Sequence, residues 1–328
     1  MTATAARVRR ELVHRANEQE ILVSPPWREA DGGYGGSTVT TAVSPYYRDH
    51  PGTHLADVLL LVEACRQTAL SAAHEFEGLS NDIAFFFNSI ELEITDLAAL
   101  TRVGGELRIA TEFEALRLRG DGSPKQIAYA QRCTDGSDGE SGEGGAADAG
   151  PVLVRASMAV QGVPKTRYQE LRAYQRSGSL PPTTAGLRSA ARPEGLAAPE
   201  SVARTLAANV ALADVRGDGE VVSATLAPDL ANASLFDHDY DHFPAMVLIE
   251  AGRQLALAGS GDPTGHAVTA VRATFPQFAE LDADTRIVAT RRGEWVDVEC
   301  VQQDLVVTRM SFRLAPAVAG DGTRGRER

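Results

Sequence analysis

Two apolar segments of the chain each carry a glutamate, an arginine and a glutamine within one helical turn. The segments are LLLVEACRQTALSA (residues 59–72) and MVLIEAGRQLALAG (residues 246–259). The polar residues are Glu63, Arg66 and Gln67 in the first segment and Glu250, Arg253 and Gln254 in the second. Residues three and four positions apart share a helix face, so each trio can form one cluster. Such a cluster can supply a base and an anion-binding group, or it can be an intrahelical ion pair.

The near-identity of the two segments predicts that one helix-centred unit occurs twice in the chain. A carboxylate and a guanidinium in an apolar helix are rarely buried unless they are paired or functional. A single trio would favour a solvated ion pair. Because the trio recurs, both interpretations stay open.

Strand-like runs surround each predicted helix. The first helix is predicted over residues 57–75, and its strands over 20–24, 37–44, 83–94, 106–118, 126–133 and 152–163. The strands around the second helix are predicted over 209–215, 220–227, 267–275, 286–293, 295–303 and 305–315. Most runs alternate apolar and polar residues, as half-buried antiparallel strands do. The predicted fold class is α+β, a tandem (double) hotdog in which each long central helix is wrapped by a curved antiparallel sheet.

Composition shifts suggest the domain limits. We expect a first unit over residues 8–168, a linker over 169–199, a second unit over 200–316 and a frayed tail over 317–328. Within the first unit, residues 135–151 are rich in Gly, Asp and Ser and are expected to be disordered.

Composition also excludes several classes of function. The 328 residues carry a net charge of −12, which argues against nucleic acid as a partner. No charge-free apolar stretch reaches the roughly 18 residues of a membrane span, and no signal peptide is seen, so we expect a cytoplasmic protein without membrane contact. The stretch RYQELRAYQR (residues 167–176) is a candidate patch for an acidic carrier protein, or a solvated helix. Three cysteines without clustering predict neither disulfides nor zinc.

Three motifs together resemble the A-factor biosynthesis hotdog repeat family, the actinobacterial enzymes of γ-butyrolactone signal synthesis. They are LVHRANEQEILV (residues 12–23), LLLVEACRQ (59–67) and FDHDYDHFPAMVLIEAGRQ (236–254). The resemblance extends over residues 11–314. The last motif is also similar to the 3-hydroxyacyl-carrier-protein dehydratase pattern, in which a loop histidine and a helix carboxylate face each other across a thioester.

The resemblance implies an acyltransferase. It would move a 3-oxoacyl chain from a carrier protein or coenzyme A thioester onto the hydroxyl of glycerone phosphate, in the biosynthesis of a γ-butyrolactone, butenolide or furan-type signal. The sequence shows no Gly-rich phosphate loop, nucleophile elbow or zinc signature, so no cofactor or metal is expected. A homodimer is compatible with the sequence, and the length of the acyl chain stays open.

The helix residues receive roles by this resemblance. Glu63 is the candidate general base, and burial is expected to raise its pKa towards neutrality; alternatively it is the buried partner of Arg66. Arg253 would bind the phosphate, with Arg66 in a similar role, unless both form structural salt bridges. The remaining helix residues of the predicted site are Glu250, as the second copy of the carboxylate, and the amides Gln67 and Gln254.

Three histidines complete the predicted site. His14, in the VHR motif, would orient the base or shuttle a proton, although a structural role is also open. His238 and His242 lie among three aspartates in the loop before the second helix. That composition invites a metal site, but the following Phe243 and Pro244 match the hotdog loop, which needs no metal.

Several positions depart from the family pattern. The first helix is entered through Ala56, Asp57 and Val58 where the family usually has His-Asp-Pro. The second copy of VHR reads VAR (residues 202–204), and Ala245 replaces a usual glycine. These departures leave two alternatives to the acyltransferase: a dehydratase or thioesterase acting on acyl thioesters, or a non-catalytic hotdog protein that binds an acyl ligand or a partner.

Overall fold

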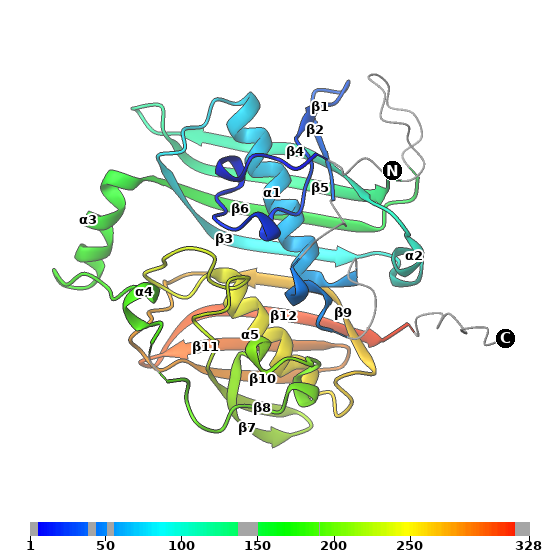
Figure 1. The fold of residues 1–328 in the computed structure, drawn as a ribbon, viewed down its shortest axis with the longest axis vertical. Coiled ribbons are helices and arrows are strands. Elements are labelled where there is room, and N and C mark those ends of the chain that lie inside the picture. Colours follow the sequence, from blue (N-terminus) through cyan, green and yellow to red (C-terminus); the bar gives the residue numbers. More distant parts are fainter. Residues whose placement is uncertain (1–5, 39–43, 51–55, 137–149, 190, 319–328) are drawn as a thin grey trace.

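One continuous antiparallel sheet of twelve strands organises the molecule (Figure 1). The computed structural model describes residues 6–38, 44–50, 56–136, 150–189 and 191–318. The strand order is β1-β2-β4-β5-β6-β3-β9-β12-β11-β10-β8-β7, so the first six strands form one half and the last six form the other. Figure 1 shows both long helices on the same face of the sheet, α1 over the first half and α5 over the second.

Each half contains six strands and one long helix. The first comprises β1 (Trp27–Arg28), β2 (Tyr34–Ser37), α1 (Val58–Phe76), β3 (Ile83–Ile94), α2 (Leu97–Arg102), β4 (Leu107–Leu118), β5 (Pro124–Asp135) and β6 (Val154–Pro164). The second comprises β7 (Leu212–Asp218), β8 (Val221–Leu226), α5 (Ala245–Ala258), β9 (His266–Thr274), β10 (Arg286–Arg292), β11 (Trp295–Gln302) and β12 (Leu305–Pro316). Between the halves lie α3 (Lys165–Gln175) and α4 (Thr184–Leu187).

The two halves join edge to edge through β3 and β9. Ile90 pairs with Ala273 and Leu92 with Val271, and all four side chains are buried. This junction continues the hydrogen-bond ladder from one unit into the next, which leaves neither inner edge exposed. The predicted tandem hotdog fold is confirmed.

Helix α1 is apolar on nearly every side because it is covered on nearly every side. It packs on its own half of the sheet, and the short helix η1 (Arg10–Val13) covers part of its other face. Asp57 begins the helix by accepting a hydrogen bond from the Leu59 amide. The helix ends at Phe76, and the left-handed Gly78 turns the chain back so that the Leu79 amide donates to the Ala73 carbonyl.

The strand predicted over residues 20–24 is wrong. A 3-10 helix, η2 (Glu18–Glu20), precedes an extended stretch with one isolated bridge between Val23 and Thr38. The reason is Gln67, whose side chain binds both the Glu20 carbonyl and the Leu22 amide. A helix side chain therefore takes the backbone groups that a neighbouring strand would otherwise use.

The helix at 57–75 and the eight strands that follow the two helices agree with the structure within a few residues, as do the strands predicted over 209–215 and 220–227. The strand predicted over 37–44 lies mostly outside the described residues, which omit 39–43. The predicted disordered loop and frayed tail lie mostly outside the described residues, which omit 137–149 and 319–328. The limits predicted for the two units and the linker remain predictions. No helix within the described ranges is long and apolar enough to cross a membrane.

Candidate active site

A buried polar network surrounds Glu63 on α1. Arg15 Nε donates to Glu63 Oε1 at 2.9 Å, and Arg66 contacts both carboxylate oxygens at 2.7 and 2.9 Å. Gln67 Nε2 donates to the same carboxylate at 2.6 Å. Glu63 is completely buried, so its charge is compensated by protein groups rather than by water.

The second unit builds the same network around Glu250 on α5. Arg204 Nε donates to it at 2.8 Å, Arg253 Nε at 2.8 Å, and Gln254 also donates to it. The sequence prediction included the helix residues but missed the second arginine of each network, Arg15 in one unit and Arg204 in the other. The sequence did contain an indication of this arginine. The corresponding motifs VHR and VAR have the same first and last residues, so the arginine occurs in both copies.

These contacts overturn the pKa expected for Glu63. Burial alone opposes ionisation, but Arg15 and Arg66 outweigh it and lower the pKa of Glu63 to about 2. Arg204 and Arg253 likewise lower the pKa of Glu250 to about 2 despite its burial. The prediction that the Glu63 pKa rises towards neutrality is wrong, because it neglected a second arginine that the fold brings to the carboxylate.

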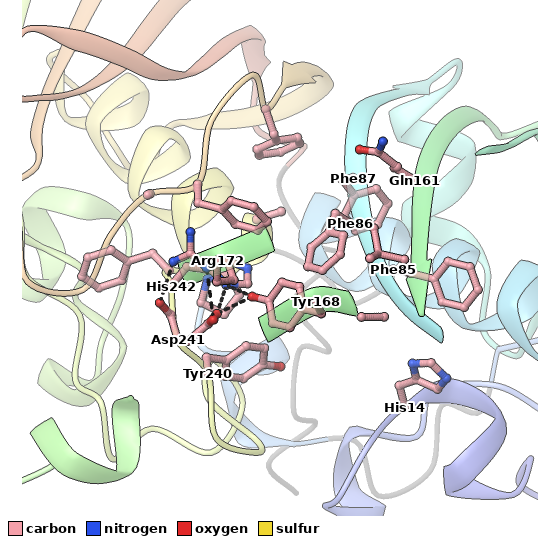
Figure 2. Close-up of a pocket in the computed structure, with 18 of the residues that line it drawn as sticks. His14, Phe85, Phe86, Phe87, Gln161, Tyr168, Arg172, Tyr240, Asp241 and His242 are labelled. Carbon is pink, nitrogen blue, oxygen red and sulfur yellow. Dashed lines mark hydrogen bonds and ion pairs between the residues drawn. The ribbon is translucent and has the colours of Figure 1, made fainter. Parts of the chain in front are cut away.

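A cavity of about 1360 Å³ lies at the junction of the two units (Figure 2). The first unit lines it with residues from η1, α1 and β3, and the second with the loop before α5. The predicted site residues in its wall are His14, Glu63, Arg66, His238 and His242. Figure 2 shows His14 and Phe85 on one side of this space, with Asp241 and His242 on the other.

The structure does not bring the other predicted residues into this cavity. Gln67 lies behind Glu63, where it binds the backbone near Glu20. Arg253 instead borders a cavity of only about 40 Å³, together with Asp57 and Ala203. Glu250 and Gln254 are completely buried in the second network. The predicted base and the predicted phosphate ligand Arg253 therefore occupy separate places.

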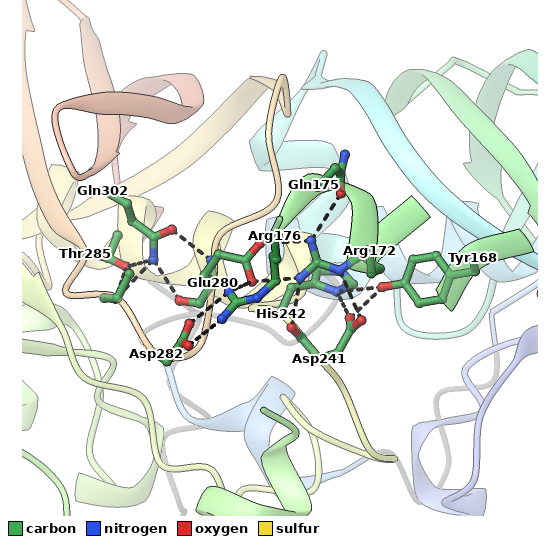
Figure 3. A network of polar contacts seen from close by, with 11 residues as sticks. Tyr168, Arg172, Gln175, Arg176, Asp241, His242, Glu280, Asp282, Thr285 and Gln302 are labelled. Carbon is green, nitrogen blue, oxygen red and sulfur yellow. Dashed lines mark hydrogen bonds and ion pairs between the residues drawn. The ribbon is translucent and has the colours of Figure 1, made fainter. Parts of the chain in front are cut away.

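His242 is held by a network that the sequence did not reveal (Figure 3). Its Nδ1 lies 2.6 Å from Asp241 Oδ1, and the Tyr168 hydroxyl donates to the same oxygen at 2.5 Å. Arg172 binds the other oxygen of Asp241 and, through two contacts, Glu280. Because a carboxylate accepts, His242 Nδ1 carries the proton in neutral imidazole and Nε2 carries the lone pair.

The stretch RYQELRAYQR contributes to this network from α3. Arg172 is almost completely buried between Asp241, Glu280 and the ring of Phe278, and Arg176 pairs with Asp282 and Glu280. The third arginine of the stretch, Arg167, lies 4.0 Å from Asp121, so all three are engaged within the chain. The helix itself was foreseen as one of two alternatives, but the contacts of Tyr168 and Arg172 with the loop were not.

The aspartates of the loop before α5 have protein partners. Asp237 accepts from the amides of Ala16 and Asn17, and Asp239 from the amide of Ala185. Asp237 also lies 2.8 Å from His238 Nδ1. Within the described ranges, no group of three or more His, Cys, Asp or Glu residues is arranged to hold a metal ion. The loop composition is therefore explained by contacts that hold it against the first unit and α4.

His14 stands at the wall of the cavity as a neutral imidazole. Burial, reinforced by the charge of Arg66, lowers its pKa to about 3. Its Nε2 lies 3.1 Å from Nε2 of His74, a residue that no sequence motif identified. The backbone of His14 is left-handed, with φ of 52°, and Ala203 adopts the same conformation with φ of 54°. The turn is thus a shared feature of the fold, and only the imidazole is specific to the first unit.

The two long helices differ at their N-termini. Asp57 caps α1, whereas no side chain within the described ranges caps α5, whose N-cap residue is Pro244. Pro244, Ala245 and Met246 all line the large cavity. The first amides of a helix have no intrahelical acceptor, so this end of α5 offers donors and a positive dipole to a bound oxygen.

Two hotdog units joined edge to edge, with a cavity at their junction, define a double-hotdog protein. The chain belongs to the A-factor biosynthesis hotdog domain family, which matches residues 1–123 and 187–323. This confirms the family predicted from the three motifs.

Several relatives of the chain carry one name, 2-oxo-3-(phosphooxy)propyl 3-oxoalkanoate synthase. The protein from Streptomyces griseus is 29% identical over 73% of this chain and 72% of its own length. That from Streptomyces virginiae is 28% identical over 86% and 85%, and that from Streptomyces coelicolor is 28% identical over 88% and 83%.

Solved structures also resemble the chain at low identity. A MaoC-like dehydratase is 15% identical, with 82% of this chain and 91% of that chain covered and a TM-score of 0.43. A bifunctional dehydratase-cyclase domain in ambruticin biosynthesis is 20% identical, with 90% and 96% covered and a TM-score of 0.42.

Proposed function

We propose that the protein transfers a 3-oxoacyl chain from a carrier-protein or coenzyme A thioester onto the hydroxyl of glycerone phosphate. Family membership and the name shared by its relatives support this assignment. The observation that carries it is the junction cavity, which gathers histidines, cations and an uncapped helix N-terminus. Its volume of about 1360 Å³ exceeds the roughly 300–1000 Å³ of ordinary ligand pockets, which suits two substrates.

In this proposal the reaction moves one proton in two steps and uses no cofactor. The hydroxyl oxygen of glycerone phosphate attacks the thioester carbonyl, so that a C–O bond forms and the C–S bond breaks. The hydroxyl proton passes to a base and then to the departing thiolate. Because a thiol has a pKa of about 8.5, the thiolate can leave before it is protonated.

We assign the base to His14 rather than to Glu63. A carboxylate with a pKa of about 2 that is bound to two arginines is a weak proton acceptor. Both oxygens of Glu63 are also occupied by hydrogen bonds, whereas the neutral imidazole of His14 lines the cavity and can accept a proton there. Glu63 then serves to position Arg15 and Arg66, which fits its complete burial.

The anionic parts of the reaction have separate partners in this proposal. The amides of Ala245 and Met246, at the N-terminus of α5, would stabilise the oxyanion that develops on the thioester carbonyl. Lys165 and Arg66 line the cavity and lie close enough to His14 to lower its pKa. They would hold the phosphate beside the base, where the substrate hydroxyl is also needed.

An apolar extension of the cavity suits the acyl chain. A smaller cavity of about 60 Å³ shares Arg66 and Phe85, Phe86 and Phe87 with the large one. It continues along α1 past Ala69 to Phe113 and Ile127 of the sheet. An alkyl chain placed there is buried against aromatic and aliphatic side chains, which favours binding through the hydrophobic effect.

A thioesterase is the second candidate, and one observation favours it. Asp241 orients His242 so that Nε2 can take a proton, and such a base can activate water instead of a substrate hydroxyl. The two activities separate in one experiment, because hydrolysis does not require glycerone phosphate.

The test is mass spectrometry of products from a 3-oxoacyl thioester with and without glycerone phosphate. The acyltransferase predicts an acylated glycerone phosphate that forms only when both substrates are present. Thioester loss at the same rate without glycerone phosphate would support the thioesterase, and loss of water from the acyl group would indicate a dehydratase. Binding of the thioester without turnover would indicate a non-catalytic protein.

A further inference from the structure

His74 lies on the last turn of α1, behind the wall of the junction cavity. Its Nε2 is 3.1 Å from His14 Nε2, and its Nδ1 is 2.7 Å from the carbonyl oxygen of Leu79. His74 is buried and does not itself line the large cavity. The two histidines therefore form a chain that leads from a backbone carbonyl to the cavity wall.

The positions of the protons follow from this chain. A carbonyl oxygen only accepts, so Nδ1 of His74 must carry the proton that is donated to Leu79. In a neutral His74 the lone pair is then on Nε2, and the contact with His14 is satisfied only if His14 Nε2 donates. The lone pair of a neutral His14 is consequently on Nδ1.

The carbonyl at the start of the chain is fixed by the end of the helix. Gly78 has a φ of +66°, and this conformation lets the Leu79 amide bind the Ala73 carbonyl at 3.2 Å. The charged and titratable groups around the pair are Arg66, Lys165 and His238 for His14, and Lys165 for His74. With burial, these groups lower the pKa of both histidines, which keeps both rings neutral.

We propose that His74 is a positioning residue that sets the tautomer of His14, so that Nδ1 of His14 is the atom that accepts the substrate proton. The catalytic consequence of this assignment rests on the proposed function, whereas the tautomer of His14 does not depend on it. The second unit has Ala203 at the position of His14, with the same backbone conformation. The two histidines are thus an addition to a turn that folds without them.

The tautomer can be read directly by nitrogen NMR on the full chain labelled with ¹⁵N-histidine. Long-range ¹H–¹⁵N correlations distinguish a protonated ring nitrogen from an unprotonated one, and a His14→Gln variant assigns the His14 signals. We expect the Nε2–H tautomer for His14 at neutral pH. Finding Nδ1–H, or an equal mixture of tautomers, in the wild-type protein would overturn the proposal.

Two substitutions of His74 then separate positioning from simple packing. His74→Leu removes the acceptor, so His14 should shift towards a mixture of tautomers. We expect kcat to fall by up to about tenfold and KM to stay within about twofold of the wild-type value. His74→Gln keeps an acceptor and a donor and should restore both the tautomer and most of kcat. His266→Gln, in a histidine of β9 that binds the Asp262 carbonyl, is the matched control.

An unchanged His14 tautomer in His74→Leu, or a Gln variant as impaired as the Leu variant, would contradict the proposal. If His74→Leu does not fold, the wild-type spectrum and the Gln variant still decide it. If the tautomer behaves as expected but the wild-type protein forms no acylated glycerone phosphate, the proposed function fails while the tautomer assignment stands.

Discussion

The Glu63 and Glu250 networks have almost the same internal contacts but different surroundings. In each, one arginine from a preceding turn, one arginine on the helix and one glutamine bind a completely buried glutamate. The glutamine also binds two backbone groups of the segment before it, near Glu20 in the first unit and near Asn209 in the second. The duplicated part of the molecule is therefore a scaffold that ties a turn to a helix.

The surroundings distinguish the candidate site at Glu63 from its structural copy at Glu250. The first network borders about 1360 Å³ of space, and the second only about 40 Å³. Across the first lies an uncapped helix end, whereas Asp57 caps the helix end that faces the second. His14 stands where the second unit has Ala203. We conclude that the repeated trio reflects the shared fold, whereas the chemistry depends on the residues and the space that differ between the two copies.

The loop before each long helix binds the other unit. Asp237, before α5, accepts from the amides of Ala16 and Asn17 in the first unit. Asp49, before α1, accepts from the amides of Thr205 and Leu206 in the second. A loop of the other unit thus binds the turn that supplies an arginine to each network, so both units are needed to hold either network.

The largest effect is expected from His14. His14→Gln removes the assigned base, so kcat should fall by about a hundredfold to ten-thousandfold. Stability should change little, because the left-handed turn also forms with alanine at position 203. Steady-state kinetics combined with thermal unfolding checks both parts. A variant that keeps more than a tenth of kcat would remove His14 from the mechanism.

Breaking the closed network should mainly affect folding. Arg204→Ala leaves Glu250 buried beside one arginine instead of two, at a cost of about 3–5 kcal/mol in the free energy of unfolding. Urea denaturation measures this cost. The double variant Arg204→Ala, Glu250→Gln should recover part of the loss, because the uncompensated charge is gone. A cost below about 1 kcal/mol would show that the network is not the scaffold we describe.

Stability should fall with acid in two steps. The pKa of His14, lowered from 6.5 to about 3, means that the native state binds fewer protons than the unfolded state, so stability is lost as pH falls below about 6.5. Glu63 and Glu250, with pKa lowered from 4.5 to about 2, add a steeper loss below about 4.5. Unfolding free energies measured between pH 7 and 3 test this order. In His14→Gln the loss between pH 6.5 and 4.5 should become smaller, while the loss below 4.5 should remain.

The acyl extension provides a matched pair of substitutions. Ala69 on α1 lines the extension, and Ala256 is its counterpart on α5. Ala69→Leu should reduce kcat/KM for a long acyl chain about tenfold more than for a short one, because the larger side chain occupies the space of the alkyl tail. Ala256→Leu should leave this ratio unchanged, although it overpacks a buried position and lowers stability by about 1–3 kcal/mol. Equal ratios in both variants would place the acyl chain elsewhere.

The smallest effect concerns the turn shared by both units. Ala203 has a φ of 54°, which alanine adopts at a cost that glycine avoids. Ala203→Gly should therefore change stability by less than about 1 kcal/mol and leave turnover intact. Differential scanning calorimetry and the product assay together check this. A large loss of activity would show that the second turn is part of the site.

Sequence reasoning identified the fold because its signals are local and repeated. The Glu-Ala-x-Arg-Gln pattern, with x as Cys65 or Gly252, marked both helices, and alternating runs marked the strands after them. The family motifs also located His14, Glu63 and the loop histidines, which the structure brings to one cavity.

What the sequence did not reveal depends on contacts between distant segments. Arg15 reaches Glu63 across 48 positions, and Arg172 reaches Glu280 across 108, so no local pattern indicates either pair. The pKa of Glu63 was mispredicted for this reason. His74 has the same origin, since its partner His14 lies 60 positions earlier. Arg253 was assigned to the phosphate through the family resemblance, whereas the fold places it beside Asp57.

The most direct test of the account asks which of the two networks supports turnover. Acylated glycerone phosphate would be quantified by mass spectrometry for Arg66→Lys and Arg253→Lys, two identical changes at corresponding positions. We predict that Arg66→Lys loses most of the product, because Arg66 borders the large cavity, and that Arg253→Lys retains it in its folded fraction. Product that persists in Arg66→Lys and disappears from folded Arg253→Lys would place the chemistry at the second network and contradict the account.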